Sequence, residues 1–303
     1  MTRTEEGLKS DALRGALQTA LRGDVSLLAD LLVRYGGLRG MEPNLKLAAA
    51  FGAEVASMPG PVGALLTKLA DGDAAAESPR VFLPIAAAHG WTQRVRDGQD
   101  IEAGWRALQE LAADERAPVR LGTLDALIGM ALRDGAADVL VDRGRVWLED
   151  EQRELCFGST SLVVEALGDA RVLTIVRDHE ALLIYLSGVI DKAADAPRSA
   201  TRSDGRRRVL TSLAGTLAAV VSLVRRGERG FEWFRAECER ASHPELRAVL
   251  SQALLKLGHS SHAPSAAVID QLRAALQASA KPLRDPTRVR PGTGRGRRSR
   301  PTR

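Results

Sequence analysis

The chain has 303 residues, of which 45% are hydrophobic and 4% aromatic, and a formal net charge of +5. This length can bury a substantial core, as one elongated domain or two compact ones, and the hydrophobic content is ordinary for a soluble globular protein. The only cysteines, Cys156 and Cys238, exclude a disulfide framework and favour a reducing compartment, so we expect a cytoplasmic protein.

Apolar residues recur at helical spacing along nearly the whole chain, and no segment alternates as a strand should. Asp24 and Asn44 can each cap a helix, and Gly23 can end one. In chain order, helices are expected over residues 10–22, 25–35, 45–56, 62–70, 81–95, 101–113, 119–132, 136–141, 152–167, 181–192, 206–226, 231–241, 244–257 and 266–280. The fold class is therefore all-α. Residues 1–283 are expected to form one helical domain, with residues 195–205 as a candidate linker.

The run 209–224, VLTSLAGTLAAVVSLV, is the strongest membrane candidate, because it is uncharged and flanked by arginines. It has sixteen residues, whereas a spanning helix needs roughly 20 apolar residues. We expect a buried core helix and no membrane insertion, with a membrane-associated helix as the alternative. The first residues of the chain include acidic side chains and no apolar run, so we expect no signal peptide there.

The net positive charge of the chain comes from its last twenty residues. Residues 284–303 read RDPTRVRPGTGRGRRSRPTR, with eight arginines and one acid, which leaves 35 basic and 37 acidic residues in residues 1–283. A near-neutral body with a basic appendage differs from a basic nucleic-acid-binding fold. The composition of this tail predicts disorder. It is either a solubilising terminus or an electrostatic nucleic-acid tether. The tether would consist of Arg288, Arg290, Arg295, Arg297, Arg298 and Arg300.

Two predicted helix pairs resemble each other. One begins at Trp105 and reads WRALQELAADERAPVRLGTLDALIGMAL, and the other begins at Trp233 and reads WFRAECERASHPELRAVLSQALLKL. In each, a helix ends in a polar turn that holds a proline, and the next helix opens with an aliphatic residue followed by Arg120 or Arg247. These arginines are 127 residues apart, and three repeats of about 42 residues would fill that interval.

This pattern of a turn, an apolar residue and an arginine resembles the HEAT-repeat family of α-solenoids, chiefly over residues 105–132 and 231–257. The resemblance implies antiparallel helix pairs stacked into a curved superhelix, with the second helices lining a concave face. It makes the following residues candidates for that face or for the repeat turns: Trp105, Asp114, Arg120 and Arg247.

An arginine at the start of an inner helix can pair with an acid in the preceding turn. For Arg120 the expected partner is Asp114 or Glu115, and for Arg247 it is Glu239 or Glu245. Such pairs would fix each turn and repeat along the stack. We expect this structural role for the two arginines rather than contact with a ligand.

No segment carries a glycine-rich phosphate loop, a GxSxG motif or an HExxH motif. The spacing of His259 and His262, with His243 upstream, could hold a metal, but a zinc site needs about four ligands and no cysteine lies nearby. We therefore expect a polar loop there and predict no cofactor and no metal. The sequence favours a non-catalytic scaffold that binds a protein or peptide. A compact bundle with a ligand pocket is a further alternative.

The other alternative is a nucleic-acid-binding solenoid. HEAT-like DNA glycosylases are similar in class, and their aromatic faces can hold a cationic alkylated base. No motif matches residue by residue, and the near-neutral body argues against a positive groove for phosphates. Four arginines do lie close in sequence: Arg94, Arg96, Arg106 and Arg120. The residues that could supply such an excision site are Trp91, Trp105, Trp147, Asp114, Asp150 and Arg120.

Overall fold

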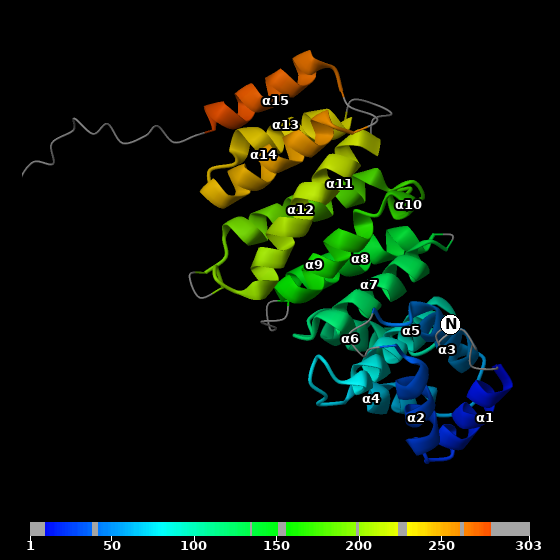
Figure 1. Cartoon of the computed structure of the whole chain (residues 1–303). Coiled ribbons are helices and arrows are strands. Elements are labelled where there is room, and N and C mark those ends of the chain that lie inside the picture. The colour runs from blue at the N-terminus through cyan, green and yellow to red at the C-terminus, as the bar shows by residue number, and fades with distance from the viewer. Residues whose placement is uncertain are drawn as a thin grey trace, which may run out of the picture.

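The computed structural model describes residues 10–37, 42–133, 135–150, 156–197, 200–223, 229–260 and 264–279. These residues form fifteen α-helices, one short 3-10 helix (Pro79–Val81) and no strand. The chain opens with α1 (Ser10–Leu21) and α2 (Ser26–Tyr35), and the four-residue α10 (Ala170–Leu173) is an insertion. The all-α prediction is confirmed (Figure 1).

The remaining helices alternate between two rows. The first row contains α3 (Leu45–Ala56), α5 (Phe82–Arg96), α7 (Ala117–Ala131), α9 (Cys156–Leu167), α12 (Asp204–Leu223) and α14 (Pro244–Gly258). The second row contains α4 (Val62–Ala70), α6 (Ile101–Ala112), α8 (Ala136–Glu149), α11 (His179–Ala194), α13 (Arg229–Arg240) and α15 (Ala266–Ala278).

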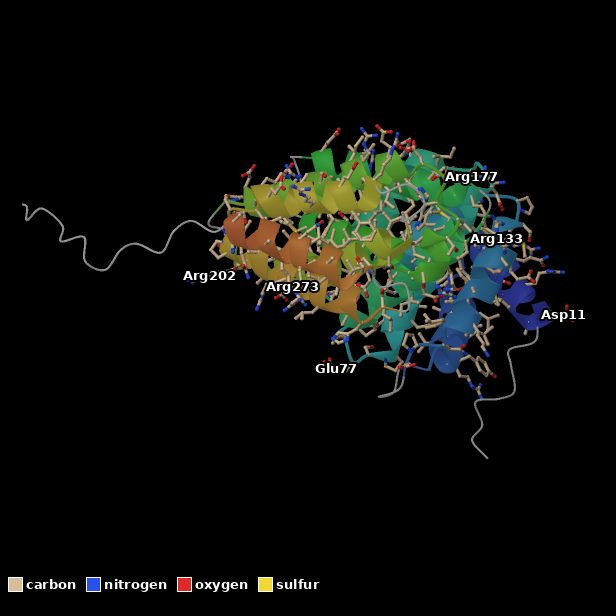
Figure 2. The ribbon with its side chains drawn as sticks, turned by 90° about the horizontal axis from the view of Figure 1, so that it is seen from above. Asp11, Glu77, Arg133, Arg177, Arg202 and Arg273 are labelled. Carbon is tan, nitrogen blue, oxygen red and sulfur yellow. The ribbon has the colours of Figure 1, made fainter. Side chains whose placement is uncertain are left out.

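Each helix of the first row packs on the next, from α3 through α5, α7, α9 and α12 to α14. In the second row α4 packs on α6, α8 on α11, α11 on α13 and α13 on α15. Figure 1 shows the stack rising from α1 and α2 at one end to α15 at the other, and in Figure 2, which looks down on the stack, Asp11 and Arg273 lie on different sides of the molecule. This stack of helix pairs is an α-solenoid.

The predicted repeat spacing is confirmed between Arg120 and Arg247. First-row helices α7, α9, α12 and α14 begin 39, 48 and 40 residues apart. Three side-chain ion pairs between helices of neighbouring pairs have a spacing close to this period. The bonded pairs are Arg14–Glu54, Arg143–Glu102 and Arg206–Glu245, which are 40, 41 and 39 residues apart.

The core runs along the first row. Twelve of the fifteen residues of α5 are buried, because helices pack around it on several sides. One close approach within the first row is at Gly122 of α7, where a Cβ atom would lie 2.4 Å from the Ile85 side chain of α5. Only a residue without a side chain permits that contact.

The apolar run forms a core helix as predicted over its described residues, 209–223, with Thr211 exposed. Val209, Leu213, Leu217 and Val221 of α12 are fully buried, and α12 packs between α9 and α14. Among the residues that the structure describes, no helix has the length and apolar character needed to cross a bilayer.

Most predicted helix boundaries agree with the structure within a few residues, but α8 is eight residues longer than expected. The charged residues after Val141 suggested an end. The apolar stripe nevertheless continues through Gly144 and Trp147, both of which are buried. Asn44 caps α3 as predicted, by accepting a bond from the Leu47 amide at 3.1 Å.

A buried arginine closes the connection between α11 and α12, where the candidate linker was predicted. The Arg206 side chain is 1% exposed. Its Nε and Nη2 both donate to the Ala193 carbonyl at 3.0 Å, and its Nη1 donates to the Thr201 carbonyl at 3.4 Å and to Glu245 Oε2 at 2.6 Å. One side chain therefore joins the end of α11, the connection and the start of α14.

Candidate functional site

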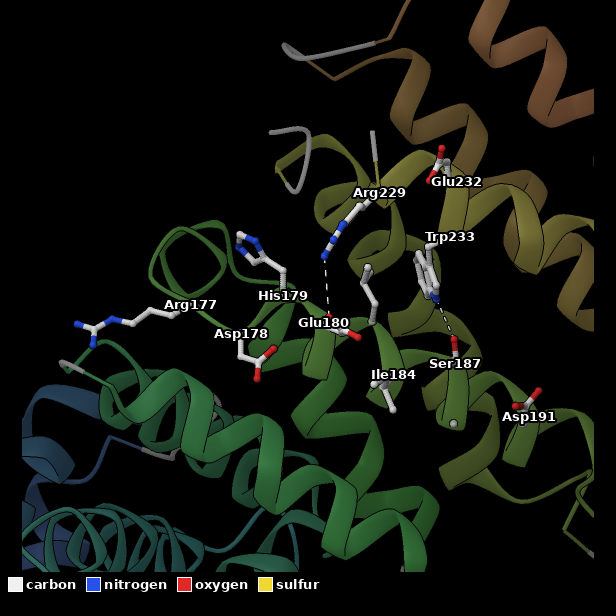
Figure 3. Close-up of a pocket in the computed structure, with 12 residues that line it drawn as sticks. Arg177, Asp178, His179, Glu180, Ile184, Ser187, Asp191, Arg229, Glu232 and Trp233 are labelled. Carbon is white, nitrogen blue, oxygen red and sulfur yellow. Dashed lines mark hydrogen bonds and ion pairs between the residues drawn. The ribbon is translucent and has the colours of Figure 1, made fainter. Parts of the chain in front are cut away.

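Two grooves lie between neighbouring helices of the second row. The larger, of about 950 Å³, is lined by residues of α11 and α13 and of the turn before α11, and we call it the α11–α13 groove (Figure 3). The smaller, of about 510 Å³, lies between α6 and α8 and is the α6–α8 groove. Because its Trp233 is half-buried, whereas the tryptophans of the smaller groove are at most 3% exposed, the larger groove is the candidate site.

One face of α11 forms a wall of the larger groove. Glu180, Ile184, Ser187 and Asp191 are spaced by four, three and four residues, which places them on the same side of the helix. The Ile184 side chain is 52% exposed, so an apolar surface lies between two carboxylates. Asp178 caps the helix by accepting a bond from the Ala181 amide at 2.8 Å.

Trp233 of α13 forms the opposite wall, and hydrogen bonds fix its ring. Its Nε1–H donates to Ser187 Oγ at 2.8 Å, and the Ser187 hydroxyl donates to Glu237 Oε1 at 2.6 Å. Figure 3 shows the indole edge directed at Ser187 across the groove. The ring remains half-buried, so part of its face is open to a ligand.

Glu237 is a buried carboxylate, and Arg240 neutralises it. The Arg240 Nε and Nη2 donate to Glu237 at 2.7 and 2.9 Å, while its Nη1 lies 3.0 Å from Asp191 Oδ1. Bonds therefore connect Trp233, Ser187, Glu237, Arg240 and Asp191 across the two helices. This network holds the groove in one shape, which lowers the entropic cost of binding.

Acidic groups outnumber basic groups around the larger groove. Four carboxylates line it, against the two guanidinium groups of Arg177 and Arg229. In the part of the chain that the structure describes, Glu232 has no ion-pair partner. Glu180 lies 3.9 Å from Arg229, and both side chains are more than three-quarters exposed, so this pair is weak. The groove therefore favours a cationic ligand.

The α6–α8 groove contains an arginine that already fills a comparable position. The Arg143 guanidinium lies 5.3 Å from the centre of the Trp105 ring and donates to Glu102 at 2.9 Å. Trp105 meets Trp147 edge-on, with ring centres 5.8 Å apart. In the part of the chain that the structure describes, no cation lies over the Trp233 ring of the larger groove.

The predicted turn residues of the first helix pair do meet, but with different partners. Arg120 Nη1 donates to the backbone carbonyls of Asp114 and Glu115 at 2.7 and 2.6 Å, not to their carboxylates. Instead, Arg116 Nη2 donates to the Asp114 carboxylate at 2.6 Å, and Arg116 Nη1 donates to the Gly72 carbonyl at 2.6 Å. The prediction of an Arg120 ion pair was therefore wrong, because Arg116 lies closer in sequence to that carboxylate.

The prediction for the second turn was also wrong. Arg247 Nη1 donates to Ser279 Oγ at 3.1 Å, after the end of α15. Of its expected partners, Glu245 pairs with Arg206 and Glu239 pairs with Arg235. Arg206, one residue before the position equivalent to Arg120, therefore forms the link between repeats.

Trp105 is not a surface residue of the stack. Trp91, Trp105 and Trp147 are 2%, 1% and 3% exposed, since each belongs to the apolar face of its helix. Their rings are not available to a flipped base. Arg94 is also buried and donates to Asp100 at 2.6 Å. This arrangement weighs against the excision site that these residues could have formed.

The histidine prediction is tested only in part. His259 follows α14 directly, whereas His262 lies outside the described residues. Across the described ranges, no three His, Cys, Asp or Glu side chains come together in a group that could hold a metal ion. The arginine-rich tail, residues 284–303, also lies outside them, so its disorder and its role as a tether stay predictions.

Sequence reasoning missed the α11–α13 groove. The helix over residues 181–192 was expected, but the stripe from Glu180 to Asp191 was not recognised as a second, exposed face. An isoleucine at helical spacing between two acids was the available signal. No sequence signal indicated that Ser187, 46 residues away, would bond to Trp233.

No protein-family model and no curated protein matches the chain. Among solved structures, it is similar to a designed armadillo repeat protein, YIII(Dq)4CqI, at 16% identity and a TM-score of 0.38, over 88% of this chain and 99% of that one. This TM-score is too low to assign the fold. The assignment of an α-solenoid therefore depends on the packing of the two helix rows. The HEAT family remains a resemblance.

Proposed function

We propose that this protein is a non-catalytic scaffold that binds an arginine-bearing segment of a protein partner in the α11–α13 groove. The observation that carries the proposal is the half-buried ring of Trp233 beside Glu232: among the described residues, no cation lies over the ring and Glu232 has no ion-pair partner. A guanidinium can stack on an indole face while it donates to a carboxylate. The exposed Ile184 would contact an aliphatic neighbour of that arginine.

The α6–α8 groove supports this chemistry, because Arg143 already makes the proposed contacts with Trp105 and Glu102. The acidic excess in the larger groove weighs against nucleic acid on this surface, since phosphate contacts need positive charge. We also propose a cytoplasmic location. Cys238 is a buried free thiol, which suits a reducing compartment.

A labelled peptide of sequence RLGRLG tests the proposal by fluorescence anisotropy, with KLGKLG and ELGELG as controls. The assay uses the full chain and a variant in which six of the eight tail arginines are replaced by glutamine, so that the charge of the tail cannot mask binding. We expect the arginine peptide to bind better than the lysine peptide, because only a planar guanidinium can both stack and donate in pairs. Equal affinity for the acidic peptide would contradict the proposal.

Two variants of α13 provide a matched comparison. Glu232→Gln removes a carboxylate from the groove, whereas Glu239→Gln removes one that pairs with Arg235 and does not line the groove. We expect the first to weaken RLGRLG binding about fivefold and the second to leave it unchanged. Trp233→Leu should weaken it about tenfold, the size expected for a partly desolvated cation–π contact. Equal affinities for all of these variants would exclude the groove as the site.

A further inference from the structure

The α11–α13 groove has the features of a cation-binding site, and among the described residues no cation lies over its Trp233 ring. It presents a tryptophan face and four carboxylates, of which Glu232 has no described partner and Glu180 has one at 3.9 Å. In the α6–α8 groove the chain fills the comparable position with its own Arg143. The larger groove has room for several side chains, since its volume is about 950 Å³.

The same chain carries a complementary segment. Residues 284–303 hold eight arginines and one acid, whereas residues 1–283 hold 35 basic and 37 acidic residues. The run RGRR at residues 295–298 places guanidinium groups one and two residues apart. The glycines of segment 284–303 let its backbone approach a surface closely. This segment thus offers the arginines that the groove favours.

The path of the chain brings this segment to the groove. Ser279, directly after α15, bonds to Arg247 in the first turn of α14. Three residues join that turn to the end of α13 at Arg240, and Arg240 contacts Asp191 in the wall of the groove. The last described residue therefore lies at the end of the stack where α13 ends and α14 begins, the same end at which Arg240 contacts Asp191 of the groove.

The length of the segment is sufficient. The sequence continues for 24 residues after Ser279, which can span about 80 Å when extended. An α-helix of twelve residues such as α13 is only about 18 Å long. A tethered segment of this length has an effective concentration on the order of millimolar, so even weak contacts suffice for occupancy.

We propose that the chain's own segment 284–303 occupies the α11–α13 groove in the absence of a partner. Its arginines would stack on Trp233 and pair with Glu232 and Glu180 of the same molecule. This inference rests on the proposed function, because the tail can occupy the groove only if the groove binds arginine. A partner would then bind by displacing the tail, which makes the tail an internal competitor.

Quenching of tryptophan fluorescence by neutral acrylamide tests occupancy in the full chain. Trp233 is half-buried, whereas Trp91, Trp105 and Trp147 are at most 3% exposed, so Trp233 should dominate quenching. The tail-neutralised variant replaces the following residues by glutamine: Arg288, Arg290, Arg295, Arg297, Arg298 and Arg300. We expect it to raise the quenching constant at least twofold, and 1 M NaCl should do the same for the wild type. In a Trp233→Phe background, neutralising the tail should have no effect.

The RLGRLG peptide separates this inference from the proposed function. If the tail competes, neutralising it should tighten peptide binding at least tenfold. Equal binding to both forms with unchanged quenching would overturn the tail proposal and leave the proposed function standing. Binding to neither form, with unchanged quenching, would overturn both. If protection of Trp233 grew with protein concentration, the tail of a second molecule would be the occupant, which would contradict occupancy within one chain.

Discussion

Replacing Arg206 by methionine tests how the solenoid joins its repeats. Methionine keeps much of the apolar stem but removes the guanidinium, which donates to two backbone carbonyls and to Glu245. Ala193 is fully buried, so its carbonyl would lose both side-chain donors without access to water. A buried acceptor left without its partner costs about 1–3 kcal/mol.

The loss of the ion pair adds little to that cost, because the Glu245 side chain is 53% exposed and water can solvate it. We therefore expect Arg206→Met to lower the free energy of unfolding by about 3 kcal/mol, from the carbonyl contacts and the looser packing together. Arg206→Lys should lose about 2 kcal/mol, since an ammonium cannot satisfy two carbonyls and a carboxylate in the same planar geometry.

Arg207→Met is the matched control. Arg207 is the next residue on α12, and its side chain is 68% exposed and, within the described ranges, pairs only with the exposed Asp204. Its replacement should change stability by less than about 0.5 kcal/mol. Urea unfolding followed by circular dichroism at 222 nm gives both values. If Arg206→Met were as stable as Arg207→Met, the buried arginine would not hold the connection, and the reasoning would be refuted.

Two further predictions concern the core. Gly122→Ala places a methyl group 2.4 Å from Ile85 and should cost about 1–3 kcal/mol, whereas Gly129→Ala on the same helix has nothing within 4 Å and should stabilise by up to about 1 kcal/mol; the two melting temperatures decide this. Burial lowers the pKa of His89 from 6.5 to about 4. The unfolded chain therefore takes up the proton first, and stability falls as the pH drops through that window. Asp125 Oδ2 lies 3.6 Å from Nε2 but is 45% exposed and does not offset this burial. Relative to His89→Gln, the wild type should lose about 2 kcal/mol between pH 7 and pH 5, and equal losses would contradict it.

Local signals predicted most of the helices, because each depends on nearby residues. Asn44 caps the helix that it was expected to cap, and the buried face of α12 follows from its apolar run. The end of α8 was missed because its last charged residues face out while Gly144 and Trp147 continue the buried stripe. The rise in charged residues after Val141 hid the fact that the buried stripe of α8 continues to Trp147.

The polar links were harder to predict, because they depend on which repeat lies beside which. Arg120, Arg206 and Arg247 all lie in the first turn of a first-row helix, yet each has a different kind of partner. Arg120 bonds to carbonyls of the preceding turn, Arg206 to Glu245 of the next helix pair, and Arg247 to Ser279 after α15. The candidate site has the same origin, since Ser187 and Trp233 meet only through the packing of α11 on α13. A contact across 46 residues follows from the stack and not from a motif.

The central claim is that an arginine-bearing segment binds at Trp233, and indole resonances in a two-dimensional proton–nitrogen NMR spectrum test it directly. The chain has four tryptophans, and Trp233→Phe assigns the resonance of Trp233. On addition of RLGRLG to the tail-neutralised protein, we predict that this resonance shifts, because the peptide lies against the ring whose Nε1–H bonds to Ser187. The three buried indoles should keep their positions. A Trp233 resonance that stays fixed while the peptide binds would contradict the claim.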